Sequence, residues 1–550
     1  MKKYQIIFIF PYFLILSFIQ NKEVFLLIDF EDGDISAFTK RADWDPTVLT
    51  LKKDGEMKGS NYLWVSGRNE FWDGAQISIL EYCVIEGRYI ASIFVKASEK
   101  GKFCILRDTI NSLNEHQYKS LKCVEIEANT LVGINDIKFE IPSDTQKAYI
   151  YFEIAGKIEY GIDDFKIKVD ESKIEENIDS LKDVYKNYFK FGTAAIVDEL
   201  EPSMSKKLIL KHFNSLTVGN ELKPDYLLDK DATFEYAQAN NNYTNPLVHI
   251  GSAKYILDFC EENNIPVRGH VLVWHEQTPL WFFKEKYEES GEWADKDTMI
   301  KRLENYIKNV FNIMKENYPK INFYAWDVVN EAWLEFGNHR EGGYGDGKSL
   351  WVQIFGDNSF IKYAFKFAKK YKMEGCKLFY NDYNEFFEGR RDAIINMTKE
   401  LNKEERLIDG VGMQAHLSVD FHDFELYEKA IKGYIEAGLE IQVTELDIGA
   451  NNCTYLGFQN QANFFSKYFD LLTNYSNYIT AVIIWGIKDD ISWRVDVCPL
   501  LFYGNYTAKP CYYSIIDGIE NDSDNNNGIT HLSLNGILLI ILLLDMIPFI

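Results

Sequence analysis

The sequence is short of positive charge. Its 550 residues include 59 Lys and Arg but 83 Asp and Glu, which gives a formal net charge of −24. A chain with this charge is repelled by nucleic acids and by anionic lipid surfaces. The composition therefore excludes nucleic acid as an expected partner and favours a soluble protein that acts on a neutral or weakly charged substrate.

Cysteines are also few, and no two of them form a CxxC pair. The eight are Cys83, Cys104, Cys123, Cys260, Cys376, Cys453, Cys498 and Cys511. Without CxxC pairs, the usual signatures of zinc and redox sites are missing. We expect no metal and no organic cofactor in the chemistry, and the sequence leaves any disulfide pairing open.

The N-terminal end of the chain has the composition of a targeting segment. Lys2 and Lys3 precede an apolar run over residues 6–19, which is the pattern of a signal peptide. We predict that residues 1–20 are such a signal, with an uncleaved anchor as the alternative. Six Asn-x-Ser/Thr sequons agree with a secretory route, at Asn242, Asn396, Asn452, Asn474, Asn505 and Asn521.

Residues 519–550 combine a polar spacer with a hydrophobic tail. The spacer is rich in Asn, Asp and Ser over residues 521–527, and the tail is apolar over residues 537–550 except for Asp545. This is the pattern of a GPI-anchor signal, and an ordinary C-terminal membrane tail is the alternative. We expect a secreted or cell-surface monomer that is attached to a membrane only through this terminal anchor.

The region 24–170 has the pattern of an all-β sandwich. Short runs alternate between apolar and polar residues and are separated by turn residues. In one run, Ile150, Phe152 and Ile154 alternate with more polar neighbours. The charged residues 171–182 that follow are predicted to be a linker, with a solvated entry helix as the alternative.

Residues 183–518 instead alternate between strands and helices. The predicted strands lie near residues 189–194, 215–219, 266–274, 322–330, 377–382, 410–416, 441–448 and 479–487. Segments with an apolar helical face separate them, for example Ile300, Leu303, Ile307, Val310, Phe311 and Met314. Eight such repeats predict an α/β fold, the (β/α)8 TIM barrel, whose active site is formed where the strands end.

Polar and aromatic residues close six consecutive predicted strands. They are His270, Trp274 and Gln277 in the third, Asn330 and Glu331 in the fourth, Tyr383 in the fifth, Gln414 and His416 in the sixth, Glu445 and Asp447 in the seventh, and Trp485 and Trp493 in the eighth. A single Asn at a strand end is usually a turn former, and a single Trp usually packs. Six strand ends in succession are harder to explain by packing, and we interpret them as one active site.

Glu331 and Glu445 suit retaining glycoside hydrolysis. This chemistry needs an acid/base and a nucleophile about 5–5.5 Å apart, and strands four and seven lie on opposite sides of a barrel. Asn330 is placed to bond the sugar 2-hydroxyl. An acid needs a raised pKa, and we expect Trp326 and Trp333 to provide some of the apolar surroundings that raise it.

The remaining strand ends have supporting roles in this interpretation. His416, oriented by Asp447, is the expected hydrogen-bond donor to the ionised Glu445. Sugar rings stack on aromatic side chains. The expected walls of the site are therefore Trp274, Trp485 and Trp493.

Six motifs together resemble glycoside hydrolase family 10, the endo-β-1,4-xylanases. They are WDVVNEAW, VTELDIGA, GHVLVWHEQTPLW, GMQAHL, NDYN and WGIKDDISW, within a resemblance that spans residues 185–518. The resemblance implies that Glu331 is the acid/base and Glu445 the nucleophile. It also implies that the subsite at the cleavage point is lined by Asn330, His270, Trp274, Gln277, Gln414, His416 and Trp485.

One stretch departs from the family pattern. The family usually reads T-x-E-N-x-M-K-W after the second strand, and this chain reads TVGNELKPDY. Asn220 and Lys223, which the family uses against the neighbouring sugar, are present. Gly219 replaces the Glu and Pro224 replaces the Trp, so fewer polar contacts are expected for the second sugar on the non-reducing side.

The N-terminal region resembles carbohydrate-binding module family 22, a xylan-binding sandwich. The matching stretches are LLIDFEDGDISAF, LWVSGRNEFWDGAQISI and YGIDDFKIKV. The candidate sugar contacts are Trp72 for stacking and Arg68, Tyr151 and Glu153 for hydrogen bonds. The alternative is that these side chains only pack within the sandwich.

The sequence thus predicts a retaining endo-β-1,4-xylanase with an attached carbohydrate-binding module and xylan, or a related plant cell-wall polysaccharide, as its partner. Two alternatives remain. One is a related retaining β-glycanase of altered specificity, for which Gly219 and Pro224 leave room. The other is a surface protein that binds glycans without cleaving them, against which the presence of both Glu331 and Glu445 argues.

Overall fold

The computed structural model describes residues 26–83, 88–142, 144–170, 174–345 and 347–527. The chain divides into two compact units, Met1–Glu171 and Ser172–Ile550. The predicted signal peptide and hydrophobic tail lie outside the described residues. Each unit has its own hydrophobic core.

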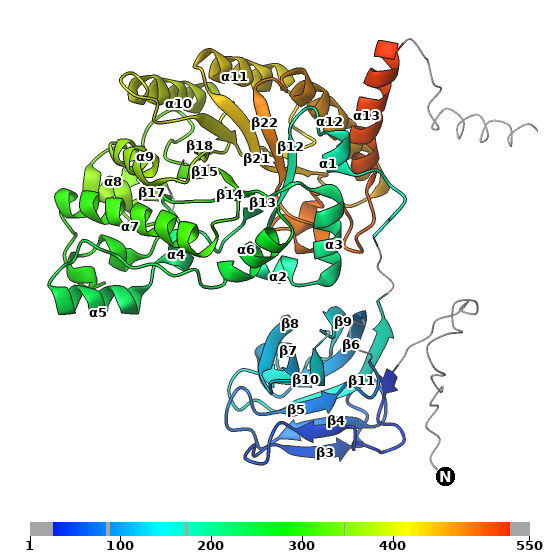
Figure 1. Cartoon of the computed structure of the whole chain (residues 1–550). Coiled ribbons are helices and arrows are strands. Elements are labelled where there is room, and N and C mark those ends of the chain that lie inside the picture. Colours follow the sequence, from blue (N-terminus) through cyan, green and yellow to red (C-terminus); the bar gives the residue numbers. More distant parts are fainter. Residues whose placement is uncertain (1–25, 84–87, 143, 171–173, 346, 528–550) are drawn as a thin grey trace, which may run out of the picture. The chain divides into compact units, whose positions relative to one another are not determined.

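The N-terminal unit contains two antiparallel sheets (Figure 1). One sheet has the order β3-β4-β11-β6-β9, with β1 also paired to β11, and the other has the order β2-β5-β10-β7-β8. The strands are β1 (Leu26–Ile28), β2 (Phe38–Lys40), β3 (Val48–Lys52), β4 (Tyr62–Ser66), β5 (Ala75–Ser78), β6 (Arg88–Ala97), β7 (Gly101–Asn111), β8 (His116–Ile126), β9 (Val132–Glu140), β10 (Thr145–Ile154) and β11 (Tyr160–Val169). The prediction of an all-β module is confirmed.

Alternation along the strands builds the core of this unit. Ile150, Phe152 and Ile154 of β10 are buried, because successive side chains of a strand point to opposite faces. A disulfide joins Cys104 to Cys123, which are opposite one another on β7 and β8. This disulfide, whose pairing the sequence left open, therefore joins two neighbouring strands of one sheet.

The C-terminal unit is a closed barrel of eight parallel strands (Figure 1). Neighbouring strands pair in the order β12-β13-β14-β15-β18-β19-β21-β22, and β22 pairs with β12 to close the ring. The strands are β12 (Lys190–Ala195), β13 (Ser215–Val218), β14 (Val267–Gly269), β15 (Phe323–Asn330), β18 (Lys377–Asp382), β19 (Gly410–Met413), β21 (Glu440–Gly449) and β22 (Ile479–Ile484). The predicted (β/α)8 fold is confirmed.

Each barrel strand is followed by a helix of ten or more residues. These helices are α3 (Ser203–His212), α6 (Ala253–Glu262), α7 (Lys296–Asn317), α9 (Phe360–Tyr371), α10 (Glu388–Leu401), α11 (Phe424–Glu436), α12 (Tyr455–Asn474) and α13 (Pro510–Asn527). Helix α7 begins where the Asp295 carboxylate accepts a bond from the Thr298 amide. Its buried face includes Leu303, Ile307 and Val310, as the 3.6-residue period predicts.

The loops at the C-terminal ends of the strands contain further short elements. They are β16 (Glu341–Gly342), β17 (Lys348–Ser349) and α8 (Leu350–Phe355) after β15, and β20 (His416–Ser418) after β19. Strand β20 pairs with the end of β21, where His416 is opposite Asp447. The other short or inserted α-helices of this unit are α1 (Leu181–Val184), α2 (Val197–Leu200), α4 (Pro224–Leu227) and α5 (Lys230–Asn240).

Helix α13 extends into the predicted polar spacer. The spacer was predicted to begin at residue 519, and the helix continues to Asn527. No Pro or Gly follows Gly518 in this stretch, and extending an existing helix costs much less than starting one. None of the helices in the described part of the chain is long and apolar enough to span a bilayer.

Candidate active site

The predicted strand ends meet at one edge of the barrel. Asn330 at the end of β15 is in register with Asn381 on β18. His416 on β20 is in register with Asp447 on β21. The strand pairing thus brings together side chains that are 51 and 31 residues apart in sequence.

Glu331 follows directly on β15 and is held by three hydrogen bonds. Its Oε1 accepts bonds from Asn330 Nδ2 at 3.0 Å and Gln414 Nε2 at 2.9 Å, and its Oε2 accepts one from Trp274 Nε1 at 3.1 Å. Burial raises the pKa of the Glu331 carboxyl above its ordinary value. The charge of Glu445 adds to this rise, whereas the bond from Gln414 opposes it.

Glu445 lies on β21, and the pKa of its carboxyl is shifted in the opposite direction. It is 5% exposed, and its Oε1 accepts a bond from Asn381 Nδ2 at 2.7 Å while its Oε2 is 3.2 Å from His416 Nε2. Burial favours the neutral form. The bond from His416 and the charge of His270 outweigh burial and bring the pKa of Glu445 to about 2.

The two carboxylates share a chain of amides. Asn381 Nδ2 donates both to Glu445 Oε1 and to Asn330 Oδ1, the latter at 2.9 Å, and Asn330 Nδ2 donates to Glu331. An amide has one acceptor and two donors, so each member of this chain has a fixed orientation. The chain links Glu331, which follows β15, to Glu445 on β21 through one hydrogen-bond network.

Asp447 anchors the donor to Glu445. Its Oδ2 is 3.0 Å from His416 Nδ1 and 2.8 Å from Trp493 Nε1, and its Oδ1 is 2.5 Å from the Arg494 guanidinium. Burial alone would lower the pKa of His416, but the carboxylate of Asp447 and the bond to Glu445 raise it to about 10. His416 is therefore an imidazolium, oriented as predicted.

A second histidine is fixed below the carboxylates. His270 is 2% exposed, and its Nδ1 is 2.9 Å from Asp327 Oδ2. Asp327 also holds the buried Arg268 guanidinium through both carboxylate oxygens. The indole of Trp485 meets the His270 ring edge-on, with centroids 5.4 Å apart. His270 and Trp485 thus lie together in the barrel mouth, as the sequence predicted.

Asn220, Lys223 and Gln277 form a polar group beside Trp274. Lys223 Nζ donates to Asn220 Oδ1 and to Gln277 Oε1, both at 2.8 Å, and lies 4.9 Å from the centre of the Trp274 ring. Burial lowers the pKa of Lys223, and the charges of Glu445 and Glu331 oppose that effect. The structure brings all four predicted residues together.

Two other predicted positions are at the rim. Tyr383, after β18, is partly exposed, and the Arg390 guanidinium lies 4.2 Å from the centre of its ring. Trp493 is 64% exposed, although its indole nitrogen is bonded to Asp447. Both rings therefore offer surface to a bound molecule.

The expected role of Trp326 is wrong. Its ring packs edge-on against Phe311 of α7, with centroids 5.0 Å apart, and is fully buried on the outside of the barrel. The next residue, Asp327, faces the barrel interior, where it bonds Arg268 and His270, so alternation along β15 turns Trp326 toward the helices. Trp333 lies past Glu331, half-buried and bridged to His339, and the structure gives it no contact with the carboxyl.

The arrangement gives Glu331 and Glu445 different protonation states over the same pH range. Glu445 is ionised above a pH of about 2, and Glu331 keeps its proton until the pH exceeds its raised pKa. Between these limits one group donates a proton while the other attacks as an anion. This is the pair of states that a retaining glycosidase needs.

Comparison with known proteins decides the family. Residues 180–518, more than half of the chain, match the family described as glycosyl hydrolase family 10. The chain belongs to glycosyl hydrolase family 10. Residues 22–157 match a family described as a carbohydrate binding domain.

Relatives of the family 10 chain share both units. Endo-1,4-β-xylanase Y of Acetivibrio thermocellus is 36% identical over 506 residues, which cover 88% of this chain and 46% of that protein. Endo-1,4-β-xylanase A of Thermotoga maritima is 35% identical, with 86% and 45% covered. This chain thus spans about half the length of the curated relatives it matches.

A solved structure also covers both units. It is the N-terminal part of Clostridium thermocellum endo-1,4-β-D-xylanase 10B, a CBM22-1 module with a family 10 module, in complex with xylohexaose. The identity is 34% and the TM-score is 0.60, over 88% of this chain and 94% of that one.

The departure from the usual family 10 pattern has a local cause. A Cβ at Gly219 would come within 2.9 Å of the Ile196 side chain, so a larger residue needs this neighbour to move. Pro224 is at the first position of α4, where its fixed φ suits a helix start. The glycine and the proline are therefore consistent with this backbone.

The carbohydrate-binding unit corrects two predicted sugar contacts. Arg68 is 3% exposed, and its guanidinium donates to the backbone carbonyls of Asp73, Ile158 and Ile154. Because its donors are used inside the sandwich, Arg68 is a structural residue. Tyr151 is buried as well, and the guanidinium of a different arginine lies over its ring.

That arginine is Arg41, which the sequence interpretation missed. Its guanidinium lies 4.0 Å from the centre of the Tyr151 ring, 3.1 Å from Glu153 Oε1 and 3.0 Å from the Trp72 carbonyl. Trp72 is 37% exposed and Tyr118, which meets Tyr151 edge-on, is 58% exposed. The exposed surface of this cluster therefore comes from Trp72, Tyr118 and the partly covered Arg41–Glu153 pair.

Two residues of the barrel site were also left out of the predicted set. Asn381 is the first residue of the NDYN motif but was given no role, and it bonds Glu445. Arg494 stands beside Trp493 and bonds Asp447. The position of Asn381 in NDYN was a usable signal, whereas nothing in the sequence distinguishes Arg494 from other surface arginines.

Proposed function

We propose that this family 10 chain is a retaining endo-β-1,4-xylanase. The observation that carries the proposal is the pair Glu331 and Glu445, one with a raised pKa and the other with a pKa of about 2. The names of the two bacterial relatives and the xylohexaose complex of the related structure support xylan as the substrate. Glycan binding without cleavage would give no reason for this separation of protonation states.

The reaction proceeds in two displacements. In the first, the Glu331 carboxyl gives its proton to the glycosidic oxygen while Glu445 attacks the anomeric carbon, and the leaving sugar departs. In the second, the Glu331 carboxylate takes a proton from water, which attacks the same carbon and releases Glu445. Two inversions at one carbon retain its configuration.

Neighbouring side chains stabilise the charges that develop. The His416 imidazolium balances the Glu445 anion before attack, and Asn330 is positioned near the 2-hydroxyl of the reacting sugar. Trp274 bonds Glu331 and lies beside Lys223, on the side where the sugar before the cleaved bond is held. Preorganised donors of this kind need no reorganisation when the transition state forms.

A substrate panel tests this proposal. Purified protein is assayed on xylan, mixed-linkage β-glucan and mannan, and we expect turnover of xylan with release of internal fragments. NMR of the first products is expected to show the β-anomer. Negligible activity on xylan together with cleavage of another glycan identifies the alternative β-glycanase, and an initial α-anomer excludes the retaining mechanism.

The N-terminal unit is proposed to bind xylan through the Trp72 face. Trp72→Ala removes the stacking surface. In the purified whole chain, this change is expected to weaken binding to soluble xylan about tenfold. Affinity electrophoresis measures the binding. Trp64→Phe on β4 is the matched control, because Trp64 is held by Lys52 and Glu159 away from this cluster. Equal affinity of Trp72→Ala and the original protein contradicts the proposed face.

Secretion and a GPI anchor are proposed on the pattern of the chain ends alone. Phosphatidylinositol-specific phospholipase C is expected to release the protein from intact cells into the medium. Retention on the cells with the C-terminal peptide still detectable favours a membrane tail instead.

A further inference from the structure

Residues 492–500, here called the capping segment, lie against the end of β21. The Ile448 amide donates to the Pro499 carbonyl at 3.1 Å, and the Ala450 amide donates to the Val497 carbonyl at 2.8 Å. These bonds come directly after Asp447, the residue that orients His416. The capping segment thus continues the barrel edge beyond the strand that contains the nucleophile.

Two side chains of the capping segment reach Asp447 directly. Trp493 Nε1 and Arg494 Nη1 bond its two carboxylate oxygens at 2.8 and 2.5 Å. Arg494 also donates to the Leu417 carbonyl on β20 at 2.9 Å. Together with His416, these donors occupy both oxygens of a carboxylate that is fully buried.

Before its buried last two residues, Pro499 and Leu500, the capping segment has little apolar anchoring of its own. Trp493 is 64% exposed and Val495 is 45% exposed, and the 3₁₀ turn Val495–Val497 has no buried residue. A segment with few buried apolar contacts opens locally at low free-energy cost unless something else restrains it. The restraint is found at Cys498.

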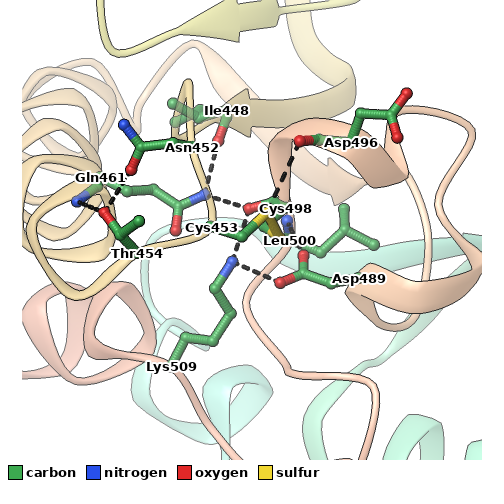
Figure 2. The surroundings of a disulfide bond; sticks show 11 residues. Ile448, Asn452, Cys453, Thr454, Gln461, Asp489, Asp496, Cys498, Leu500 and Lys509 are labelled. Carbon is green, nitrogen blue, oxygen red and sulfur yellow. Dashed lines mark hydrogen bonds and ion pairs between the residues drawn. A yellow bond between two sulfur atoms is a disulfide. The ribbon is translucent and has the colours of Figure 1, made fainter.

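Cys498 is fixed by a covalent bond and by two buried donors. Its sulfur is bonded to Cys453, which follows β21. Figure 2 shows Gln461 of α12 and Lys509 beside this disulfide, and their side-chain nitrogens donate to the Cys498 carbonyl at 2.8 and 2.7 Å. Gln461 and Lys509 are both fully buried.

Each of these donors is itself held in place. Gln461 also donates to the Ile448 carbonyl at 2.7 Å, and Lys509 pairs with Asp489 at 2.8 Å. Cys498 has a left-handed backbone conformation, with φ at +46°, which a non-glycine residue keeps only where its surroundings hold it. The disulfide thus adds a covalent bond to the non-covalent contacts that hold Cys498, and it ties the capping segment to the loop after β21.

We propose that the Cys453–Cys498 disulfide is a positioning element for the nucleophile. It holds Trp493 and Arg494 on Asp447, so that Asp447 keeps His416 oriented toward Glu445. The link runs through the bonds of 2.8 and 2.5 Å to Asp447, 3.0 Å from Asp447 to His416 and 3.2 Å from His416 to Glu445. This inference rests on the proposed glycosidase function of the same site.

The inference gives a direction for the pH dependence. If the capping segment opens, Asp447 loses the two donors that orient it and turns away from His416, and the loss of this neighbouring anion lowers the pKa of His416. Glu445 then loses part of the charge that keeps its carboxyl ionised, so its pKa rises from about 2 and the acid limb of kcat/KM moves to higher pH. The alkaline limb, which reports Glu331, is expected to stay in place.

Other charged groups face this chain of contacts. His416 also faces the buried Glu385, and Glu445 faces His270, Lys223 and Glu331. None of these four is bonded to the capping segment in the described part of the chain. Loss of the disulfide is therefore expected to reach Glu445 through Asp447 and His416.

The experiment compares two double variants. Cys453→Ser/Cys498→Ser is expected to move the acid limb of kcat/KM up by about one pH unit on an aryl xylobioside, with the alkaline limb unchanged. Cys104→Ser/Cys123→Ser removes the disulfide of the N-terminal unit and is the matched control, in which neither limb is expected to move. Thermal melts of both variants show that each is folded at the assay temperature.

A third variant makes the test independent of how the serine variant folds. Arg494→Met keeps the disulfide and removes one donor to Asp447, and the acid limb is again expected to move upward. An unmoved acid limb in Arg494→Met, or in a folded Cys453→Ser/Cys498→Ser protein, overturns the inference, as does an equal shift in the control. An inactive original protein instead overturns the proposed function.

Discussion

Glu445→Ala is expected to lower kcat on xylan by roughly 10⁴- to 10⁶-fold, the range seen when a covalent nucleophile is removed. The barrel then still binds substrate, because the stacking and amide contacts of the site remain. It lacks the anion that attacks the anomeric carbon, and the buried site offers no other carboxylate in that position. Steady-state rates on xylan and on aryl xylobiosides measure the loss.

Azide sharpens this prediction. A small anion that fits the space left by the Glu445 side chain attacks the same face of the sugar, so the product is expected to be the α-glycosyl azide. Glu440→Ala on the same strand is the control, because Glu440 pairs with Lys377 at the opposite end of β21. A β-azide, or an equal loss of rate in the Glu440 variant, shows that Glu445 is not the nucleophile.

Glu331→Ala is expected to slow xylan hydrolysis by about 10²- to 10⁴-fold, the usual contribution of general acid–base catalysis. The effect depends on the leaving group. A dinitrophenolate leaves without a proton, so formation of the glycosyl-enzyme is expected to be nearly normal on dinitrophenyl xylobioside. Pre-steady-state bursts measure that step, and hydrolysis of the intermediate becomes rate-limiting because no base activates water.

The pH profile and azide provide two further readouts for this variant. The alkaline limb reports loss of the Glu331 proton, and it is expected to disappear in Glu331→Ala. Azide is expected to give the β-glycosyl azide, since attack follows the route of the water. Glu335→Gln, an exposed carboxylate in the same loop, is the control. A rate loss that is equal for all leaving groups excludes Glu331 as the acid.

The barrel itself could be predicted because its strands are buried on both sides. The strand that ends at Asn330 is a nearly continuous apolar run, and the helix that begins at Lys296 has one apolar face. These patterns follow from burial alone. One prediction on this strand failed, because Trp326 alternates with the inward-facing Asp327 and therefore packs on α7, outside the barrel.

The sugar-binding cluster of the N-terminal unit was predicted less well. A sandwich strand alternates between its faces, but loops bring in residues that alternation does not order. Arg68 and Arg41 are both arginines in loops beside β-strands, and only the structure shows that one bonds backbone carbonyls while the other pairs with Glu153. The choice depends on which carbonyls point inward, and a sequence does not contain that information.

The sequence by itself determined the eight-stranded barrel, the two carboxylates and most of the polar residues around them. It did so because each strand end is a local feature, and one fold rule places all strand ends at the same edge. Only the tertiary structure decided the protonation of those groups. The pKa values of Glu331 and Glu445 depend on desolvation and on donors such as Gln414, Asn381 and His416, which are brought near by strand pairing and lie far away along the chain.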